Sequence, residues 1–170
     1  MSLKIKLSFI FLLCCFCKLY AQQANADSLK QYELCYYSQC FGFPVTAINN
    51  DRLFDCIDLW TGTKYKLAGS DLDGIDCSRF AMMVYNYAYG KTIDGTADEL
   101  YKKCRHIDKD ELEQGNLVFF KTSKRRISHV GVYLGDNKFA HSSSSNGIII
   151  SDLDEPYYKK YFAGGGVVEN

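Results

Sequence analysis

One cysteine, Cys77, lies where a polar loop ends and an amphipathic helix begins, which is a position that suits a nucleophile. The residues expected on the buried face of that helix are Phe80, Ala81, Val84, Tyr87 and Ala88, and Gly90 supplies a stop signal. Asp76 is the expected N-cap, so Cys77 falls in the first turn, where free N–H groups and the helix dipole favour a thiolate. The alternative is a small buried apolar residue, which is the commoner fate of cysteine.

Two histidines lie close enough in one predicted β-hairpin to serve such a thiol. The predicted strands are Ser128–Leu134 and Lys138–His141, and the turn between them is Gly135–Asn137. In this register His141 lies opposite Gly131 and is the diagonal neighbour of His129, about 7–8 Å away on the same face. One imidazole could then act on the thiol while the second orients the first. The alternative is that both histidines only pack against the strands or cap them.

Helices precede strands in the predicted order of elements. Further helices are predicted over Asn50–Trp60 and Thr96–Cys104, the second with a capping box between Thr96 and Glu99. Further strands are predicted within Gly115–Phe120, Ile148–Ile150 and Gly164–Val168, the last as an edge or final strand. We therefore predict an α+β fold in which N-terminal helices pack on an antiparallel sheet of about five to six strands.

The first residues are predicted to be a targeting signal rather than part of the fold. A basic n-region precedes the apolar run Leu7–Cys17, which is too short to span a membrane and is typical of a signal peptide. The predicted signal covers residues 1–21, with Ala26 as the latest cleavage point. The rest of the chain then comprises an N-terminal extension over residues 27–48 and a catalytic domain over residues 49–170.

Export sets the expected location and partners. We expect a monomer in the periplasm or outside the cell, without a transmembrane segment once the signal is removed. Removal of Lys4, Lys6 and Lys18 leaves 17 basic and 20 acidic residues, a net charge of −3. This balance argues against nucleic acid as a partner, because nucleic-acid binding needs a clear basic surplus.

Export also changes what we expect of the cysteines, because an odd number in an oxidising compartment suggests pairs plus one free thiol. The cysteines outside the signal are Cys35, Cys40, Cys56, Cys77 and Cys104. Cys35 could pair with Cys40, and Cys56 with Cys104, although the sequence leaves the connectivity open. Zinc binding is the rival, yet no Cys-x-x-Cys or His-x-x-x-His spacing supports it, so we expect no metal and no cofactor.

From about Leu53 to Val168 the chain resembles the NlpC-type cysteine peptidases of bacterial cell walls, a papain-like family. The segments that carry the resemblance are Trp60–Tyr65, Gly74–Ser78, Gly115–Phe120, His129–Gly135 and Phe139–Ser143. The resemblance implies a papain-like fold and an exported peptidase that hydrolyses peptidoglycan stem peptides through a thioester. It implies that the amide bond adjoins a D-amino acid or diaminopimelate.

The resemblance also assigns roles to individual residues. It implies a triad of nucleophile, base and third polar residue, namely Cys77, His129 and His141. It places Tyr65 near the oxyanion, with Asp76 and Ser78 shaping the turn that holds the cysteine. The family usually has glycine where this chain has Arg79, whose long side chain could narrow or charge the cleft and favour a carboxylate-bearing substrate.

Other functions fit the same residues. The triad would equally serve a peptidoglycan amidase or a secreted antibacterial toxin, and a degenerate relative would be a non-catalytic wall-binding module. All three triad residues are present, which favours an enzyme. We expect His106 to be a surface residue and the basic loop Lys121–Arg126 to be solvated, although this loop could instead meet substrate carboxylates at the mouth of a cleft.

Overall fold

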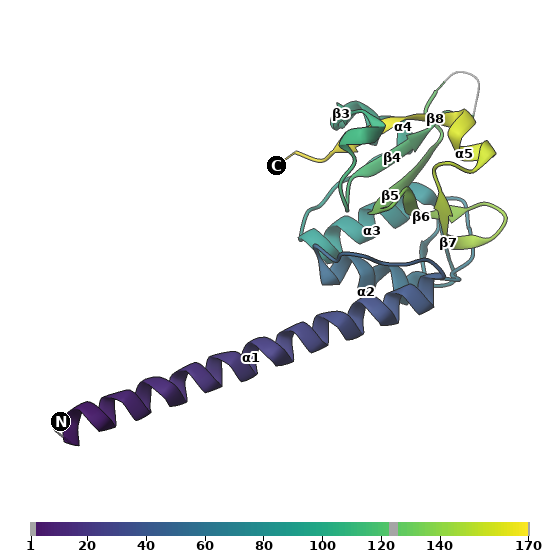
Figure 1. Ribbon diagram of the computed structural model, residues 1–170. Helices are drawn as coiled ribbons and strands as arrows, with labels where there is room; N and C mark the ends of the chain where they lie inside the picture. Colours follow the sequence, from purple (N-terminus) through teal and green to yellow (C-terminus); the bar gives the residue numbers. More distant parts are fainter. Residues whose placement is uncertain (1–2, 123–125, 170) are drawn as a thin grey trace. The chain divides into compact units, whose positions relative to one another are not determined.

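The computed structural model describes residues 3–122 and 126–169 and divides into two compact units, Met1–Ala47 and Ile48–Asn170 (Figure 1). The first unit contains the long helix α1 (Leu3–Phe41). The predicted signal falls within this helix except for residues 1 and 2, which lie outside the described residues, so its cleavage stays a prediction. Within the described part of the chain, no helix has both the length and the apolar character needed to cross a bilayer.

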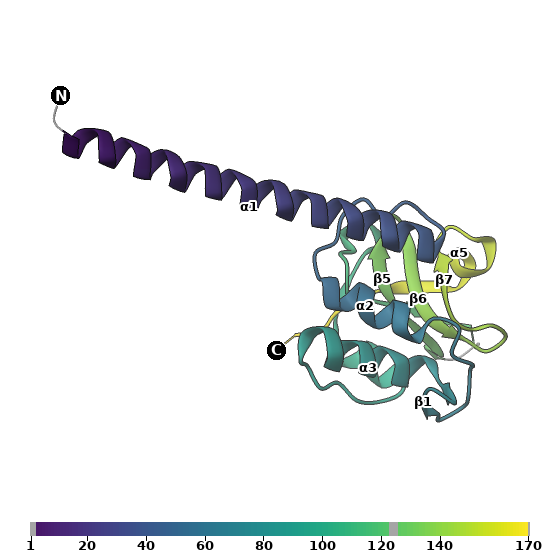
Figure 2. The same ribbon diagram turned by 90° about the horizontal axis from the view of Figure 1, so that it is seen from below.

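The second unit begins with helices, as the sequence predicts. Its helices are α2 (Asp51–Trp60), α3 (Cys77–Tyr89), α4 (Ala97–Lys103) and α5 (Pro156–Tyr161), with a 3-10 turn η1 at Lys109–Glu111. The predicted capping box of Thr96 and Glu99 starts α4. Helices α2 and α3 pack against each other, and α3 also contacts β5 and β6, the central part of the sheet described next (Figures 1 and 2).

An antiparallel sheet of six strands forms the rest of this unit, which confirms the predicted α+β class. In order across the sheet the strands are β3 (Arg105–Ile107), β8 (Phe162–Val167), β4 (Leu117–Phe120), β5 (His129–Gly135), β6 (Lys138–Ser143) and β7 (Gly147–Asp152). A separate small hairpin of β1 (Ser70–Asp71) and β2 (Gly74–Ile75) precedes α3.

The segment Gly164–Val168, predicted as an edge or final strand, belongs to the final strand of the chain but does not lie at the edge of the sheet. Strand β8 lies between β3 and β4, and β3 is the edge. Gly165 and Gly166 permit this close packing, because a Cβ atom at Gly165 would lie 2.7 Å from Leu112 and one at Gly166 would lie 2.8 Å from Cys104. Strand β3 was missed because it is short, and only its last residue is buried.

Strand β4 forms the centre of the core, because all four of its side chains are fully buried. Val118 and Phe120 belong to a cluster that includes Phe139, against which side chains of α5 pack. Phe119 points to the other face, where its ring packs edge-on against Tyr101 of α4. A strand that is covered on both faces has apolar residues at every position, and the sequence Leu117–Phe120 shows this pattern.

Helix α3 begins and ends where the sequence predicts. The side chain of Asp76 caps its first turn, and Gly90 closes it in the left-handed region at φ 64°. The prediction for Tyr87 was wrong, since this residue is 40% exposed, whereas Tyr85 is buried and donates a hydrogen bond to the Gly115 carbonyl. The buried arc is centred near Val84, so Tyr87 lies at its margin.

Neither of the disulfides that we considered is formed, because all five cysteines outside the predicted signal are free. Cys35 and Cys40 lie on one helix, where residues five apart point in different directions and cannot be bridged. Cys56 is buried on α2 with its sulfur 3.4 Å from the sulfur of Met83. Cys104 lies against Gly166 of β8.

Candidate active site

The turn that carries Cys77 is held by the carboxylate of Asp76. One carboxylate oxygen accepts hydrogen bonds from the backbone N–H of Arg79 and the hydroxyl of Ser78, both at 2.8 Å. The other accepts from the backbone N–H of Ala68 at 3.1 Å. Asp76 therefore ties the start of α3 to the preceding loop and fixes the orientation of Cys77.

Tyr65 is positioned beside this turn by backbone pairing. It forms a parallel bridge with Ile75, and the flanking residues exchange N–H···O bonds with Ile75 at 3.0 and 3.4 Å. The carbonyl of Ile75 also accepts a hydrogen bond from the buried hydroxyl of Ser142 at 2.6 Å. Burial, and then the nearby Cys77 and Asp76, raise the pKa of Tyr65, so its hydroxyl stays protonated and can donate.

The two histidines lie in the register that the sequence predicts. Val132 pairs with Ala140, so the next pair along the hairpin brings His141 opposite Gly131. The Nε2 atom of His129 lies 2.9 Å from Nδ1 of His141, and the two rings are perpendicular. The tight turn between the strands has two residues instead of the expected three, Asp136 and Asn137, both with positive φ as in a type I′ turn.

His141 is held at its far nitrogen by two hydroxyl groups that the sequence analysis missed. Its Nε2 atom lies 3.2 Å from the Ser151 hydroxyl on β7 and 3.1 Å from the Tyr158 hydroxyl on α5. The ring of His141 also stacks on Phe139 at 4.9 Å. Ser151 could have been found only from the pairing of β6 with β7, in which it lies opposite Phe139, and no sequence signal marked Tyr158.

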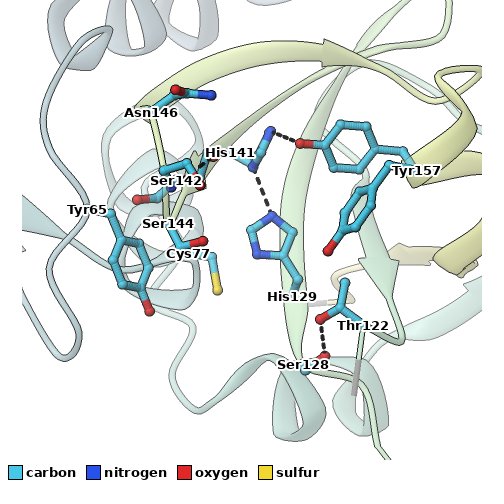
Figure 3. Close-up of a pocket in the computed structure, with 13 residues that line it drawn as sticks. Tyr65, Cys77, Thr122, Ser128, His129, His141, Ser142, Ser144, Asn146 and Tyr157 are labelled. Atoms are coloured by element: carbon cyan, nitrogen blue, oxygen red, sulfur yellow. Dashed lines mark hydrogen bonds between the residues drawn. The ribbon is translucent and has the colours of Figure 1, made fainter. Parts of the chain in front are cut away.

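These contacts allow an arrangement of the ring protons that leaves a base beside the thiol. Both hydroxyl oxygens can accept a hydrogen bond from Nε2–H of His141. With its proton on Nε2, His141 accepts at Nδ1 from the Nε2–H of His129. Nδ1 of His129 is then unprotonated, and Figure 3 shows the sulfur of Cys77 on this side of the ring. An unprotonated nitrogen that faces a thiol is what a general base requires.

Burial keeps both the thiol and the imidazoles neutral. Desolvation lowers the pKa of His129 to about 4, and desolvation and the neighbouring His129 lower the pKa of His141 well below its ordinary value. Desolvation also raises the pKa of Cys77, although the backbone N–H groups of Val130 and Ser78 act in the opposite direction. The thiolate expected from the helix N-terminus is therefore not the resting form, because burial outweighs the helix end.

Two cavities meet at the nucleophile. The larger, of about 510 Å³, is bounded by both histidines and by the serine-rich loop that follows β6 (Figure 3). The smaller, of about 240 Å³, is bounded by the capping turn and by residues of α4 and the loop before β5. Tyr65, Cys77 and Ser128 line both cavities, so the predicted nucleophile lies at the junction of one continuous cleft.

Two residues considered in the sequence lie away from this cleft. Arg79 is exposed, and it is not among the described residues that line either cavity. It lies two positions beyond Cys77, so its side chain is on another side of α3. His106 is exposed, as expected, and stacks on Tyr101. Of the basic loop, Lys124 and Arg125 lie outside the described residues, whereas Arg126 borders the smaller cavity.

The comparison with known families agrees with this geometry. The model of the NlpC/P60 family matches residues 62–167, which contain Cys77 and both histidines of the cleft. The chain belongs to the NlpC/P60 family. A crystal structure of an NlpC/P60 family protein from Bacillus cereus covers 74% of this chain and 42% of its own, with a TM-score of 0.65 and 28% identity. The predicted papain-like α+β architecture is thus confirmed for this NlpC/P60 chain.

Named relatives of this NlpC/P60 chain share about the same region. A probable endopeptidase NlpC homolog from Haemophilus influenzae is 40% identical over 118 residues, which are 69% of this chain and 62% of that protein. The murein DD-endopeptidase and murein LD-carboxypeptidase MepS of Escherichia coli is 36% identical over 111 residues, which are 65% of this chain and 58% of that protein. The chain therefore spans about six tenths of the length of these two relatives.

Proposed function

We propose that this chain is a cysteine endopeptidase that hydrolyses amide bonds in peptidoglycan stem peptides. The observation that carries the proposal is the row of side chains from Cys77 through His129 to His141 at the junction of two cavities (Figure 3). The names of the Haemophilus influenzae and Escherichia coli relatives, an endopeptidase and a murein DD-endopeptidase, support the class of reaction and the polymer.

In the first half of the reaction the Cys77 sulfur attacks the substrate carbonyl carbon. Nδ1 of His129 takes the thiol proton as the S–C bond forms, so two neutral groups become an ion pair only at that moment. The charge that develops on the carbonyl oxygen is stabilised by the backbone N–H of Cys77 and by the hydroxyl of Tyr65. His141 stabilises the charged ring of His129 by accepting its Nε2–H.

In the second half the tetrahedral intermediate collapses to products. His129 gives the proton from Nδ1 to the leaving amine as the C–N bond breaks, which leaves a thioester on Cys77. The same nitrogen then takes a proton from water, the hydroxide adds to the thioester, and the proton returns to the thiolate as the carboxylic acid leaves. The cycle thus ends with the neutral thiol and neutral imidazole with which it began.

The location follows from the substrate. We infer that the chain acts in the cell envelope, with residues 1–21 as the export signal, residues 27–48 as an extension and residues 49–170 as the catalytic domain. Support comes from the basic and apolar pattern of the first residues and from the family's match within residues 62–167. We propose that it works as a monomer, since the residues of the row all come from one chain.

The test is digestion of purified peptidoglycan followed by mass spectrometry of the soluble fragments. The expected products are stem peptides cut at one amide bond, and Cys77→Ala or His129→Ala should abolish them while circular dichroism shows an unchanged fold. Retention of full activity by either variant would contradict the proposal. Release of intact stem peptides from the sugar would identify an amidase, and binding without any cleavage would identify a wall-binding module.

A further inference from the structure

The proposed nucleophile and the proposed base are carried by elements that meet only through tertiary contacts. Cys77 starts α3 directly after β2, whereas His129 and His141 lie on β5 and β6. Packing of α3 against these strands brings the two parts together. Proton transfer from thiol to imidazole needs a hydrogen-bond distance, and a misplacement of about 1 Å can lower a rate about a hundredfold. A directional contact between β2 and the histidine strands is therefore needed to set this distance.

Ser142, the residue after His141 on β6, makes such a contact. Its side chain is fully buried, and its hydroxyl donates a hydrogen bond of 2.6 Å to the backbone carbonyl of Ile75 on β2. A carbonyl oxygen only accepts, so the direction of this bond is fixed. Ile75 precedes Cys77 by two residues. The bond therefore joins the strand that carries His141 to the turn that carries the nucleophile.

This bond closes a ring of hydrogen bonds around the site. The N–H of Ile75 donates to the carbonyl of Lys64 at 3.0 Å, and the neighbouring carbonyl of Thr63 accepts from the N–H of Ile148 at 2.8 Å. Ile148 lies on β7 and pairs directly with Ser142 on β6. Strand β2 is thus connected to β6 by two routes. One route is the side chain of Ser142, and the other runs through the segment of Thr63 and Lys64 and then through β7.

Resting on the proposed function, we propose that Ser142 is a positioning residue that sets the separation between the thiol of Cys77 and the two imidazoles. It acts through the carbonyl of Ile75 rather than on the substrate. When the hydroxyl is removed, this carbonyl still accepts from the N–H of Lys66, although that bond is long at 3.4 Å. The fold then keeps its second route, while the turn that holds Cys77 is free to move away from the sheet.

Ser142→Ala tests the role of the hydroxyl, and the measurement is steady-state hydrolysis of a soluble stem-peptide dimer. The value of kcat should fall about tenfold with little change in KM, because the substrate still binds while thiol and base are less well aligned. The loss should stay below a hundredfold because the route through Thr63 and Ile148 remains. Ser142→Thr keeps the hydroxyl and should recover most of the kcat of the folded enzyme.

Tyr85→Phe is the matched control, because it removes the same kind of bond further along α3. Tyr85 is buried, and its hydroxyl donates to the carbonyl of Gly115 at 2.7 Å. Ser142→Ala and Tyr85→Phe should each lower the Tm by about 2–4 °C, and only Ser142→Ala should lower kcat. An equal fall of kcat in both variants would mean that the loss reflects general destabilisation, and it would overturn the positioning role.

Two further outcomes would overturn the inference and leave the endopeptidase intact. The first is a wild-type kcat in Ser142→Ala. The second is a rise in KM at unchanged kcat, which would indicate that the hydroxyl binds substrate in the larger cavity that Ser142 lines (Figure 3). Failure of the wild type to cleave both the dimer and purified peptidoglycan would overturn the proposed function itself, and the positioning role with it.

Discussion

Nε2 of His129 lies 2.9 Å from Nδ1 of His141, so one proton is held between the two rings. If this proton is bonded to Nε2 of His129, Nδ1 of His129 is free to act as a base toward Cys77. If it is bonded to Nδ1 of His141, Nδ1 of the neutral His129 ring carries a proton and cannot act as a base. His141 is almost completely buried at 1% exposure, and its other nitrogen contacts only hydroxyl groups among the polar partners described. The protonation state of the proposed base is thus coupled to residues behind His141.

The first prediction concerns His141 itself. His141→Ala should lower kcat about a hundredfold with little change in KM, because the base loses its orientation and the charged ring loses its acceptor. His141→Asn should recover part of the loss, since the amide oxygen can accept the same hydrogen bond. The check is steady-state hydrolysis of a soluble stem-peptide dimer. Equal rates for His141→Ala and the wild type would show that His129 needs no orienting group.

The second prediction concerns the two hydroxyls behind His141. Ser151→Ala and Tyr158→Phe should each lower kcat modestly, because the remaining hydroxyl still accepts from Nε2–H. In the double variant kcat should fall about tenfold further than the product of the two single losses. The reason is that His141 then has no acceptor for its Nε2 proton, so the other tautomer becomes accessible. Independent, additive effects would mean that the hydroxyls only pack against the ring.

The third prediction is the pH dependence of kcat/KM. His129 must be unprotonated to accept the thiol proton, and burial lowers its pKa to about 4, so activity should persist in mild acid and fall only as the pH drops through about 4. Because burial also raises the pKa of Cys77, the alkaline limb should lie above the ordinary range of a thiol. An acid limb near the ordinary histidine value of about 6.5 would contradict a desolvated base.

Alkylation of Cys77 offers an independent measurement of the same property. A neutral thiol beside a neutral imidazole reacts slowly with iodoacetamide at neutral pH, whereas a preformed thiolate reacts fast. His129→Ala should therefore change the alkylation rate of the resting enzyme only slightly, although it abolishes hydrolysis. A large fall in the alkylation rate would indicate an ion pair before substrate binds.

Local patterns in the sequence were sufficient to predict the elements that carry the proposed triad. The cap at Asp76 and the stop at Gly90 need only neighbouring residues, and the hairpin of the two histidines is formed by adjacent strands. The hairpin differs in two ways that offset each other: its turn has two residues, Asp136 and Asn137, and the register shifts between Tyr133 and Gly135, which restores the predicted pairing at the histidines. These features are decided by interactions between residues close in sequence.

The rest depends on pairing between distant segments, which the sequence alone does not reveal. Ser151 and Tyr158 reach His141 only because β7 pairs with β6 and α5 packs over the sheet. The neutral state of Cys77 depends on burial by elements that follow it by many residues, and this burial reverses the effect expected from the helix end. Likewise, Arg79, which we expected to influence the cleft, is not among the described residues that line it, whereas Arg126 lies at its border.

The last prediction concerns the glycine opposite His141. A Cβ atom at Gly131 would lie 2.6 Å from the Phe139 ring, 2.9 Å from the Ala140 carbonyl oxygen and 3.2 Å from the Cβ of His141. Gly131→Ala should therefore lower the free energy of unfolding by about 1–3 kcal/mol and also lower kcat, because the strain displaces the strand that holds His141. Urea denaturation and hydrolysis of the stem-peptide dimer measure the two effects.

Gly166→Ala is the matched control for this prediction, because it creates similar crowding in β8, which pairs with β3 and β4 and not with the strands that carry His129 and His141. Its Cβ atom would lie 2.8 Å from Cys104 and 2.9 Å from the Phe119 ring. It should therefore destabilise the fold by a similar amount, about 1–3 kcal/mol, while the folded fraction keeps its kcat. If both variants lost stability and neither lost kcat, the room that Gly131 leaves beside His141 would serve folding alone, and the position of His141 would be set by Ser151 and Tyr158.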